Sequence, residues 1–288
     1  MDIVSDYDIR ISNLMTDIHQ TIQYANYLSK IGWIVERSAE VNYFIKKLPL
    51  VGSIIKIQRP EEIRIGKIRE LAKRYRALQI IIEPKDMLNG QWLMANGFKS
   101  SKSPYLPTKT LQIDLTQTKE KILRAFAKDT KTALRKTKNI KTRKVDLETF
   151  RNAWKKSVGL KRYIPPLSHL VALKKSFKKN CLFLSTGLPR QSGAAAGAIF
   201  LLADNMAYYW QAFTGKEGRK KLCQYKIVWE GILWAKKNGA KIFDFEGIYD
   251  ERFPNKSWFG FSHFKKSFGG YELLYPGCFV KNMLPFGI

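Results

Sequence analysis

The stretch AAAGAIFLLADNMAYYWQAF, residues 194–213, decides how the second half of the chain folds. It consists of two apolar runs on either side of the polar pair Asp204-Asn205. Two such runs joined by a two-residue turn of this kind are typical of a β-hairpin. The sequence therefore predicts a hairpin with strands at 194–203 and 206–213.

A helix and a further strand follow this hairpin. GKEGRKK (215–221) opens a segment in which apolar residues recur every three or four positions, and Gly239 is placed to end it. KIFDFEG (241–247) is a compact apolar strand. The order strand–strand–helix–strand resembles the Gcn5-related acyltransferase (GNAT) fold. That resemblance implies an acyl donor where the parallel strands 206–213 and 241–247 splay apart, with its phosphates at the start of the helix, near 218–221.

The loop before this helix is a poor match to a coenzyme A site. In that fold the loop usually reads Arg/Gln-x-x-Gly-x-Gly/Ala, whereas GKEGRK has Gly215 first and Lys220 last. A lysine at the last position crowds the close backbone approach that glycine permits. We therefore expect no coenzyme A and no other cofactor. Arg219 and Lys220 either form a solvated helix start or bind a polyphosphate backbone, and both interpretations stay open.

The net charge of the chain indicates which classes of molecule it binds. Its 288 residues carry 51 Lys and Arg against 24 Asp and Glu, which leaves a net charge of +27. The length is typical of about two domains, and the charge favours nucleic acid, anionic lipid or phosphorylated substrates. A general bias toward a high isoelectric point is the alternative explanation.

The sequence has few signals of disulfide bonds, metal sites or membrane-spanning segments. Three scattered cysteines predict neither a disulfide framework nor a zinc site, and no histidine has the spacing of a metal ligand. No apolar run approaches the ~18 residues that span a membrane. We expect a cytoplasmic protein without a metal ion, and leave open peripheral contact with the inner face of an anionic membrane.

A strongly basic segment lies between the two halves of the chain. Residues 119–144 hold eleven Lys and Arg, among them Lys128, Lys131 and Arg135, against two acidic residues. A modest apolar stripe within 118–144 predicts one long helix with one face packed and the rest charged. We expect this helix to face an anion; a solvated linker helix is the alternative.

NKSWFGFSHFKKSFGG, residues 255–270, places Lys265 and Lys266 among five aromatic residues. A hydrophobic core would exclude the lysines, and a solvated face would exclude most of the aromatics. The combination predicts a place that needs positive charge and flat apolar surface together.

With its neighbouring segments, this stretch resembles the FemAB/FemX family of peptidoglycan-bridge aminoacyltransferases. In that family Asp-Phe-x-Gly-Ile is followed by Trp-x-Gly and then by Phe-Lys-x-x-Phe-Gly-Gly. Here these motifs read DFEGI (244–248), WFG (258–260) and FKKSFGG (264–270). YPG (275–277) resembles the Tyr-x-Gly before the last strand of the family, and LPTKTLQIDL (106–115) resembles its Pro-x-x-Thr and Asp-Leu signature.

Three departures from the family pattern concern the acceptor more than the fold. Lys131 stands where an arginine is expected, QAF (211–213) replaces Gly-Ala-Ser, and Gln58-Arg59-Pro60 shortens a Pro-Arg-Gly-Pro turn. The chain has no long charged hairpin insertion, so the compact FemX-like form is the nearer one.

The resemblance implies an α/β (α+β) protein with two tandem GNAT-like domains, each a mixed sheet flanked by helices, without a coiled-coil insertion. We expect domain 1 at 1–145 and domain 2 at 146–274, with a strand within 275–288 returning to domain 1. The pattern of the first half agrees with this repeat. It predicts helices at 18–30, 64–76 and 86–95 and strands at 33–37, 41–47, 53–58, 78–82 and 110–115.

The resemblance also implies an activity. Aminoacyl-tRNA would donate an amino acid to an amine on the stem peptide of a peptidoglycan precursor, either lipid II or UDP-MurNAc-pentapeptide. An amine attacks an activated ester in this reaction, so no covalent enzyme intermediate is needed. The enzyme must position both reactants, stabilise the oxyanion and handle one proton. We expect it to act as a monomer.

The resemblance assigns the donor site mainly to the C-terminal motif. Lys265 would meet the tRNA acceptor end or the charge of the tetrahedral intermediate. Phe264, Phe268 and Trp258 would supply stacking or packing surface, and Gly269 would allow close approach of a backbone. The other donor-site residues are Lys266, Arg219, Lys220 and Gln211.

Five further residues complete the predicted site. Arg162 and Tyr163, in KRYIP, are expected at the precursor, where Arg162 and Arg59 would hold a diphosphate. Tyr208 faces the strand gap and would orient the acyl group, although a core position is an equal alternative. Asp244 is the candidate proton acceptor, with a structural role as its alternative.

Two rival functions remain open at this point. One is a coenzyme A-dependent N-acyltransferase on the same fold, which tight binding of acetyl-coenzyme A would support. The other is a non-catalytic RNA- or envelope-binding protein of the same fold, although no KH-type or RRM motif is present.

Overall fold

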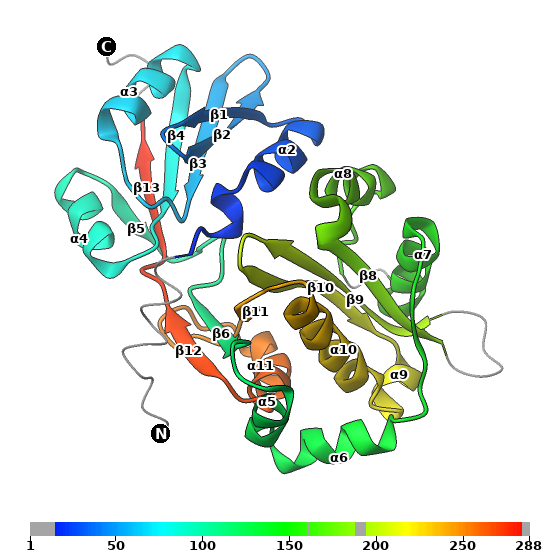
Figure 1. Ribbon diagram of the computed structural model, residues 1–288. Helices are drawn as coiled ribbons and strands as arrows, with labels where there is room; N and C mark the ends of the chain where they lie inside the picture. Colours follow the sequence, from blue (N-terminus) through cyan, green and yellow to red (C-terminus); the bar gives the residue numbers. More distant parts are fainter. Residues whose placement is uncertain (1–14, 160–161, 188–193, 284–288) are drawn as a thin grey trace. The chain divides into compact units, whose positions relative to one another are not determined.

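The computed structural model describes residues 15–159, 162–187 and 194–283, which form two compact units. Unit 1 is built mainly from Thr110–Ile248 and Ser257–Leu273. Unit 2 contains Thr16–Lys109, Tyr249–Lys256 and the described part of the chain from Leu274 onward. Each unit has its own sheet with helices packed against it (Figure 1).

Unit 2 contains a six-stranded sheet in the order β1-β2-β3-β4-β13-β5. β3 and β4 are parallel, and the other neighbours are antiparallel. The strands are β1 (Ile34–Ser38), β2 (Val41–Leu48), β3 (Gly52–Gln58), β4 (Ala77–Glu83), β5 (Lys99–Ser101) and β13 (Cys278–Asn282). The helices are η1 (Ile18–Gln20), α2 (Ile22–Lys30), α3 (Ile65–Arg74) and α4 (Met87–Ala95).

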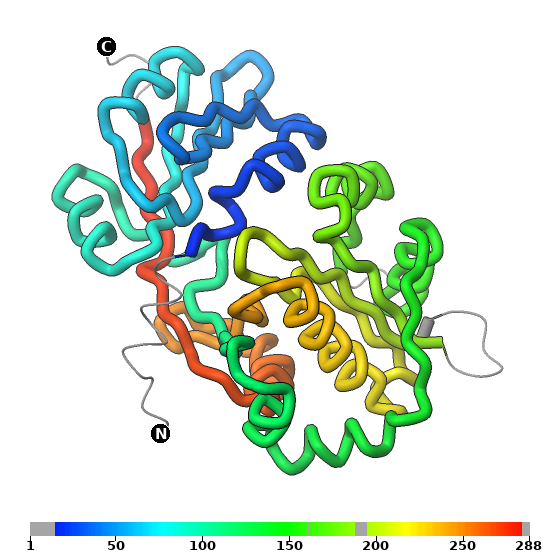
Figure 2. The backbone as a smooth tube through the Cα atoms, in the orientation of Figure 1, coloured from blue at the N-terminus to red at the C-terminus, as the bar shows by residue number. Residues whose placement is uncertain are grey.

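The last described strand, β13, lies between β4 and the edge strand β5 of this sheet. β13 pairs with β4 through Phe279 and Ile82 and with β5 through Phe279 and Ser100. Figure 2 shows this C-terminal segment, coloured red, running among the blue and cyan strands of the N-terminal part. The last described strand therefore belongs to the sheet of unit 2.

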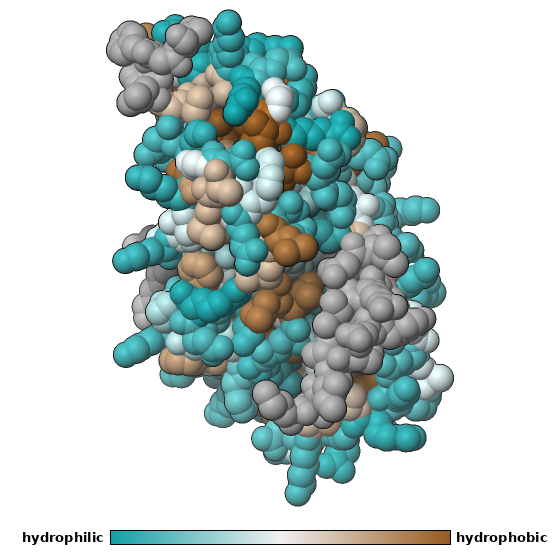
Figure 3. Space-filling model, turned by 90° about the vertical axis from the view of Figure 1, so that its left-hand side faces the viewer, coloured by the Kyte–Doolittle hydropathy of each residue, from teal (hydrophilic) through white to brown (hydrophobic). Residues whose placement is uncertain are grey.

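The surface of unit 2 has an exposed apolar helix. Met87, Leu88, Trp92 and Met94 of α4 are exposed, with Leu88 at 77% of its full accessible surface. α4 lies on the side turned to the viewer in Figure 3, where hydrophobic side chains lie among hydrophilic ones.

Unit 1 contains a seven-stranded sheet in the order β12-β6-β11-β10-β9-β8-β7. The strands are β6 (Lys109–Asp114), β7 (Thr142–Lys144), β8 (Cys181–Gly187), β9 (Ala194–Ala203), β10 (Met206–Thr214), β11 (Ile242–Gly247) and β12 (Tyr271–Leu274). The predicted hairpin is confirmed, since β9 and β10 pair in antiparallel register with Met206 opposite Ala203.

Helices cover both faces of this sheet. α10 packs against β9 with Gly231, where an added Cβ would lie 2.2 Å from the Phe200 ring. On the other face, α7 places Phe150 in edge-to-face contact with Phe183 and Phe213. The helices are α5 (Lys119–Ala125), α6 (Lys128–Lys136), α7 (Leu147–Val158), α8 (Leu167–Phe177), η2 (Lys178–Asn180), α9 (Lys216–Lys220), α10 (Cys223–Lys237), η3 (Lys256–Trp258) and α11 (Phe259–Lys266).

β10 and β11 separate along their length, as the resemblance to the GNAT fold implied. Their parallel pairing ends at Tyr208 and Asp244, although β10 continues to Thr214 and β11 to Gly247. A bulge between Tyr209 and Gln211 interrupts the pairing of β10 with β9 at the same level. The two strands therefore leave a gap that side chains of β10 and β11 border.

The structure corrects two predicted helices. The basic segment does not form one helix, because Phe126 adopts an extended conformation and ends α5 before α6 begins at Lys128; part of its C-terminal end is the short strand β7. The segment 215–221 does not open the long helix either. It forms the separate turn α9, and Leu222, in the left-handed conformation, precedes the start of α10 at Cys223.

The contacts divide the chain at a different point from the expected boundary at 145. β6 pairs with β11, with Ile113 opposite Phe243, so residues 110–145 lie in unit 1 rather than with the N-terminal sheet. A sequence pattern marks β6 as a strand but does not identify its partner, which is distant in sequence.

Candidate active site

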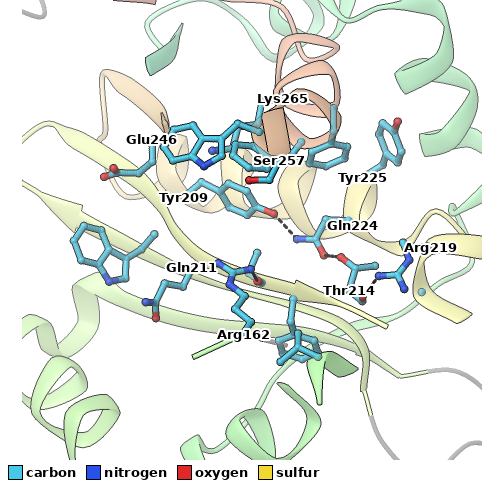
Figure 4. Close-up of a pocket in the computed structure, with 18 of the residues that line it drawn as sticks. Arg162, Tyr209, Gln211, Thr214, Arg219, Gln224, Tyr225, Glu246, Ser257 and Lys265 are labelled. Carbon is cyan, nitrogen blue, oxygen red and sulfur yellow. Dashed lines mark hydrogen bonds between the residues drawn. The ribbon is translucent and has the colours of Figure 1, made fainter. Parts of the chain in front are cut away.

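The gap between β10 and β11 opens into a cavity of about 780 Å³ in unit 1 (Figure 4). Its walls come from β10, the end of β11, the start of α10, and the segment from Ser257 to Lys265. The lining residues are Val158, Arg162, Tyr209, Trp210, Gln211, Ala212, Phe213, Thr214, Gly218, Arg219, Leu222, Gln224, Tyr225, Glu246, Ser257, Trp258, Phe261, Phe264 and Lys265.

β10 presents Tyr209 rather than Tyr208 to this cavity. Successive side chains of a strand point to opposite faces, and Tyr208 is buried away from the cavity, with 2% of its surface exposed. Gln211 lines the cavity, as predicted, and the bulge that precedes it brings Trp210 to the wall as well. Tyr209, rather than Tyr208, is therefore the candidate for orienting the acyl group.

Three polar side chains form a hydrogen-bonded chain along one wall. The hydroxyl of Thr214 donates to Oε1 of Gln224 at 2.9 Å, and Nε2 of Gln224 donates to the hydroxyl of Tyr209 at 2.6 Å (Figure 4). Since Tyr209 accepts this bond, its own proton is directed elsewhere. Burial raises the pKa of Tyr209 above its usual value, so the phenol remains neutral and can donate a hydrogen bond.

The DFEG segment shapes the end of β11. Asp244 is buried, and its carboxylate accepts hydrogen bonds from the Thr110 hydroxyl, from Nε2 of Gln112 at 2.7 Å and from the backbone N–H of Glu246 at 2.6 Å. These bonds hold Glu246 at a φ of +61°, an uncommon conformation for a residue with a side chain. Asp244 thus lies outside the cavity and fixes the turn that brings Glu246 to its wall.

Lys265 is a buried cation at the wall of the cavity. Only 8% of its surface is exposed, and its Nζ donates to the backbone carbonyl of Gly247 at 2.6 Å. The same nitrogen lies 5.1 Å from the ring centre of Phe261 and 5.9 Å from that of Tyr209. Burial lowers the pKa of Lys265 from 10.5 to about 8, although the carboxylates of Glu246 and Asp244 act in the opposite direction.

The aromatic residues around Lys265 divide into two sets. Phe268 is 1% exposed and belongs to the core, where it contacts Phe126, Phe245 and Tyr225. Phe264 contacts both Phe268 and Tyr225 and also lines the cavity. The second set, Trp258 and Phe261, packs ring to ring at 5.2 Å on the cavity wall.

The rest of the FKKSFGG segment has structural contacts. Gly269 and Gly270 both have positive φ, and a Cβ on Gly270 would lie 2.2 Å from the carbonyl oxygen of Gln112. Close approach therefore occurs, but to the protein's own backbone. Lys266 is half exposed and pairs with Glu272 at 2.5 Å.

Of the other predicted cations, Arg162 and Arg219 line the cavity and Lys220 and Tyr163 do not. Arg162 donates to the Ala212 carbonyl at 3.3 Å, and Arg219 donates to the Thr214 carbonyl at 2.6 Å. Lys220 is exposed, and Tyr163 is 73% exposed.

Arg59 is buried inside unit 2. Its guanidinium lies 3.1 Å from the ring centre of Tyr275 and donates to the Pro107 carbonyl at 2.7 Å. It is also 3.8 Å from the Asp17 carboxylate. These contacts give Arg59 a role within unit 2, where it joins the YPG segment to the LPTK segment.

The basic residues Lys128, Lys131 and Arg135 line a second cavity of unit 1, between α5, α6 and α10. Within the described residues, no group of three or more histidine, cysteine or acidic side chains is arranged to hold a metal ion. The same part of the chain contains no helix long and apolar enough to cross a membrane.

The sequence alone missed several polar residues of the cavity, among them Tyr209, Thr214, Gln224 and Glu246. Tyr209, Thr214 and Gln224 are ordinary residues of a strand and a helix, and only the three-dimensional register joins them. Glu246 was predicted only as part of the strand 241–247, whereas the structure puts it on the cavity wall with a positive φ. Its position between Asp244 and Gly247 was the only available signal.

Comparison with known proteins finds one family model that matches the C-terminal part of the chain. Residues 172–287 match the model of the FemAB family, and these residues include the DFEGI, WFG and FKKSFGG segments. No match was found among curated proteins.

Solved structures share the fold over nearly the whole chain. The crystal structure of FemX is similar with a TM-score of 0.79 and 17% identity, covering 98% of this chain and 97% of that chain. The C-terminal domain (DUF2156) of a putative lysylphosphatidylglycerol synthetase from Agrobacterium fabrum has a TM-score of 0.63 and 10% identity, covering 91% and 88%. A tandem GNAT protein from the clavulanic acid biosynthesis pathway has a TM-score of 0.53 and 10% identity, covering 87% and 83%.

The two findings agree with the motifs that line or support the cavity. The structural likeness gives the fold, and the family match contains the buried lysine and the turn that holds it. Through these residues, the C-terminal part of the chain, residues 172–287, is similar to the FemAB family.

Proposed function

We propose that unit 1 transfers an amino acid from aminoacyl-tRNA to an amine of a peptidoglycan-precursor stem peptide. The FemAB match and the GNAT-like architecture support an acyltransferase. The tRNA donor and the muropeptide acceptor come from the motif resemblance and from the net charge of +27.

The observation that carries this proposal is the buried ammonium of Lys265 beside the neutral phenol of Tyr209. Both line a cavity between two splayed strands, where an acyl group can lie in extended form. Hydrogen-bond donors fixed in a partly dry site stabilise developing negative charge far better than donors in water. An ester carbonyl between these two groups would therefore be activated for attack.

The reaction requires one bond to form and one to break. The acceptor amine attacks the ester carbonyl, and a tetrahedral intermediate forms with a negative oxygen and a positive nitrogen. The carbon–oxygen bond to the 3′-terminal ribose then breaks, and the proton lost by nitrogen ends on the ribose hydroxyl. The products are an amide and a free tRNA 3′ end, so no oxidant, reductant or covalent enzyme intermediate is involved.

The side chains of the cavity take separate parts in this reaction. Lys265 and Tyr209 donate to the oxyanion. Glu246, held at the cavity wall by Asp244, is the carboxylate placed to receive a proton from the attacking amine. Because the pKa of Lys265 lies near 8, its ammonium can also give up and regain a proton near neutral pH.

Arg162 and Arg219 are placed to hold phosphate groups at the opposite wall. Each donates one hydrogen bond to a β10 backbone carbonyl, and further guanidinium N–H groups are available to a ligand. A guanidinium binds phosphate oxygens in pairs. We assign Arg162 to the phosphates of the acceptor and Arg219 to those of the donor.

A transfer assay tests the proposal. Purified protein is incubated with a pool of labelled aminoacyl-tRNAs and either lipid II or UDP-MurNAc-pentapeptide. Label in the muropeptide, lost in Lys265→Ala and kept in Lys266→Ala, is the expected result. Transfer from acetyl-coenzyme A instead would replace the donor, and tRNA binding without transfer to either acceptor would favour a binding protein.

A further inference from the structure

A second cavity of unit 1, of about 710 Å³, lies between α5, α6 and α10. Its floor is apolar and consists of Leu123, Leu134 and Trp229. Its rim carries six cations and a single carboxylate, namely Arg124, Lys128, Lys131, Arg135, Lys138, Lys226 and Glu120. We call this site the basic groove.

Several cations of the basic groove lack an anionic partner. Lys226 pairs with Glu230 at 2.8 Å, and Lys131 donates to the backbone carbonyl of Arg124. Within the described residues, Arg124, Lys128 and Lys138 form no ion pair with a carboxylate, and all three are exposed. Same-sign charges concentrated at a concave site raise the local concentration of anions.

The break between α5 and α6 brings these cations together. A single straight helix would distribute them around a rod, whereas the extended conformation of Phe126 turns the chain between the two helices. The Phe126 ring anchors this turn by edge-to-face contacts with Trp229 at 5.3 Å and with Phe268 at 5.2 Å. The cations of both helices therefore line one cavity.

α6 is also attached directly to the active-site segment. The backbone N–H of Ala127 donates to the Ser267 carbonyl at 2.9 Å, and the Thr130 hydroxyl donates to the Ser267 hydroxyl at 2.7 Å. Ser267 follows Lys265 by two residues. The basic groove is thus held in a fixed position relative to the first cavity within unit 1.

The two cavities share α10 as a common wall. Tyr225 lines the first cavity, and Lys226 and Trp229 line the basic groove. Four residues of an α-helix rise by about 6 Å, so one ligand of nucleic-acid size can reach both sites. A ligand with a reactive end and a polyanionic body matches this pair of cavities.

We propose that the basic groove binds the sugar-phosphate backbone of the RNA duplex whose single-stranded 3′ end enters the first cavity. The designation of that RNA as the acceptor arm of tRNA rests on the proposed function. Lys128, Arg135 and Lys138 contact phosphates, and the apolar floor takes the less polar face of a ribose or base.

An anionic membrane is a poorer match to the basic groove. Interfacial binding requires apolar side chains that project into the lipid, but Trp229 at the floor is only 9% exposed. The exposed large apolar residues of the described chain lie outside the basic groove, for example on α4 in unit 2. The recessed floor and the surrounding cations favour a rod-shaped polyanion.

The test compares two charge-removing variants of the full-length protein. One is Lys128→Gln/Lys138→Gln in the basic groove. The matched control is Lys175→Gln/Lys179→Gln, two exposed lysines of unit 1 that line neither cavity. Binding to a minihelix with the acceptor stem and 3′ end of tRNA is measured by fluorescence anisotropy across a range of salt concentrations.

The groove variant is expected to bind the minihelix about tenfold or more weakly and to lower the slope of log K against log salt by about 2, since each lost phosphate contact removes about 0.9. The control should change both quantities little. Equal behaviour of the two variants would overturn the proposal. Loss of binding to anionic phospholipid vesicles, with minihelix binding unchanged, would also overturn it in favour of a membrane site.

A second measurement separates this proposal from the proposed function. Transfer is compared between aminoacyl-tRNA and a short aminoacylated 3′ oligonucleotide without a duplex. The groove variant should raise KM for the tRNA and leave transfer from the oligonucleotide unchanged. If no transfer occurs with any protein, the minihelix result still decides the binding site; an equal rise in KM for both donors would contradict it.

Discussion

The buried ammonium of Lys265 should reduce the stability of the protein at neutral pH. Its pKa of about 8 in the folded state, against 10.5 for an ordinary lysine, corresponds to about 3 kcal/mol of preference for the unfolded state while the group is charged. Lys265→Met keeps the length of the side chain and removes the charge. It also leaves the Gly247 carbonyl without its hydrogen bond, which costs about 1–3 kcal/mol.

The two terms nearly cancel at pH 7, so the variant should be as stable as the wild type or slightly more stable. The stabilities of the wild type and of Lys265→Met differ in how they depend on pH. Between the two pKa values the unfolded chain binds more protons at this group than the folded protein does, so wild-type stability rises with pH there. From pH 7 to pH 9.5 the expected rise from this group is about 2 kcal/mol, and it should be absent in Lys265→Met.

Urea unfolding of both proteins at pH 7 and pH 9.5 measures this difference. Other groups that titrate in the same range affect both proteins equally, so the difference between the two pH responses isolates Lys265. Lys266→Met is the control, because its exposed pair with Glu272 contributes at most about 1 kcal/mol. Parallel pH responses of the wild type and Lys265→Met would refute the assignment of a buried, desolvated ammonium.

Three further results are expected. Tyr209→Phe removes one oxyanion donor and should lower the rate of single-turnover transfer about 10²–10³-fold, with at most about 1–3 kcal/mol lost from the free energy of unfolding because Nε2 of Gln224 loses its acceptor; an unchanged transfer rate would exclude this role. Asp244→Asn replaces an acceptor of three hydrogen bonds and should lower the free energy of unfolding by about 1.5–3 kcal/mol in urea titrations; wild-type stability would show that the turn at Glu246 does not depend on the charge. Gly231→Ala brings a Cβ to 2.2 Å from the Phe200 ring and should destabilise the protein by about 1–3 kcal/mol, which an unaltered melting temperature would contradict.

The sequence predicted the elements of the fold better than their breaks. Apolar periodicity and turn residues were sufficient for the hairpin β9–β10 and for α3. The separation of β10 from β11 beyond Tyr208 was implied by the resemblance to the GNAT fold. The interruptions at Phe126 and Leu222 were not visible, because neither residue is a helix breaker by itself. Phe126 leaves the helical conformation where its ring packs between Trp229 and Phe268, which only the tertiary structure determines.

The sequence predicted only part of the candidate site, again because it does not show which residues meet in the tertiary structure. Lys265 and Arg162 were identified from the family resemblance and Gln211 from the expected strand gap, and all three line the cavity. Tyr208 was chosen over Tyr209 because a strand pattern gives the alternation of side chains but not which face borders the gap. Asp244 was chosen because a carboxylate can accept a proton; its three hydrogen-bond donors come from residues that are distant in sequence or held by the turn itself.

The most direct test of the central claim is a crystal structure with a stable amide analogue of a 3′-aminoacyl RNA end. The account predicts the analogue in the cavity between β10 and β11, with its carbonyl oxygen about 3 Å from Nζ of Lys265 and within reach of the Tyr209 hydroxyl. An analogue bound elsewhere, or a carbonyl turned away from Lys265 in this cavity, would contradict the account.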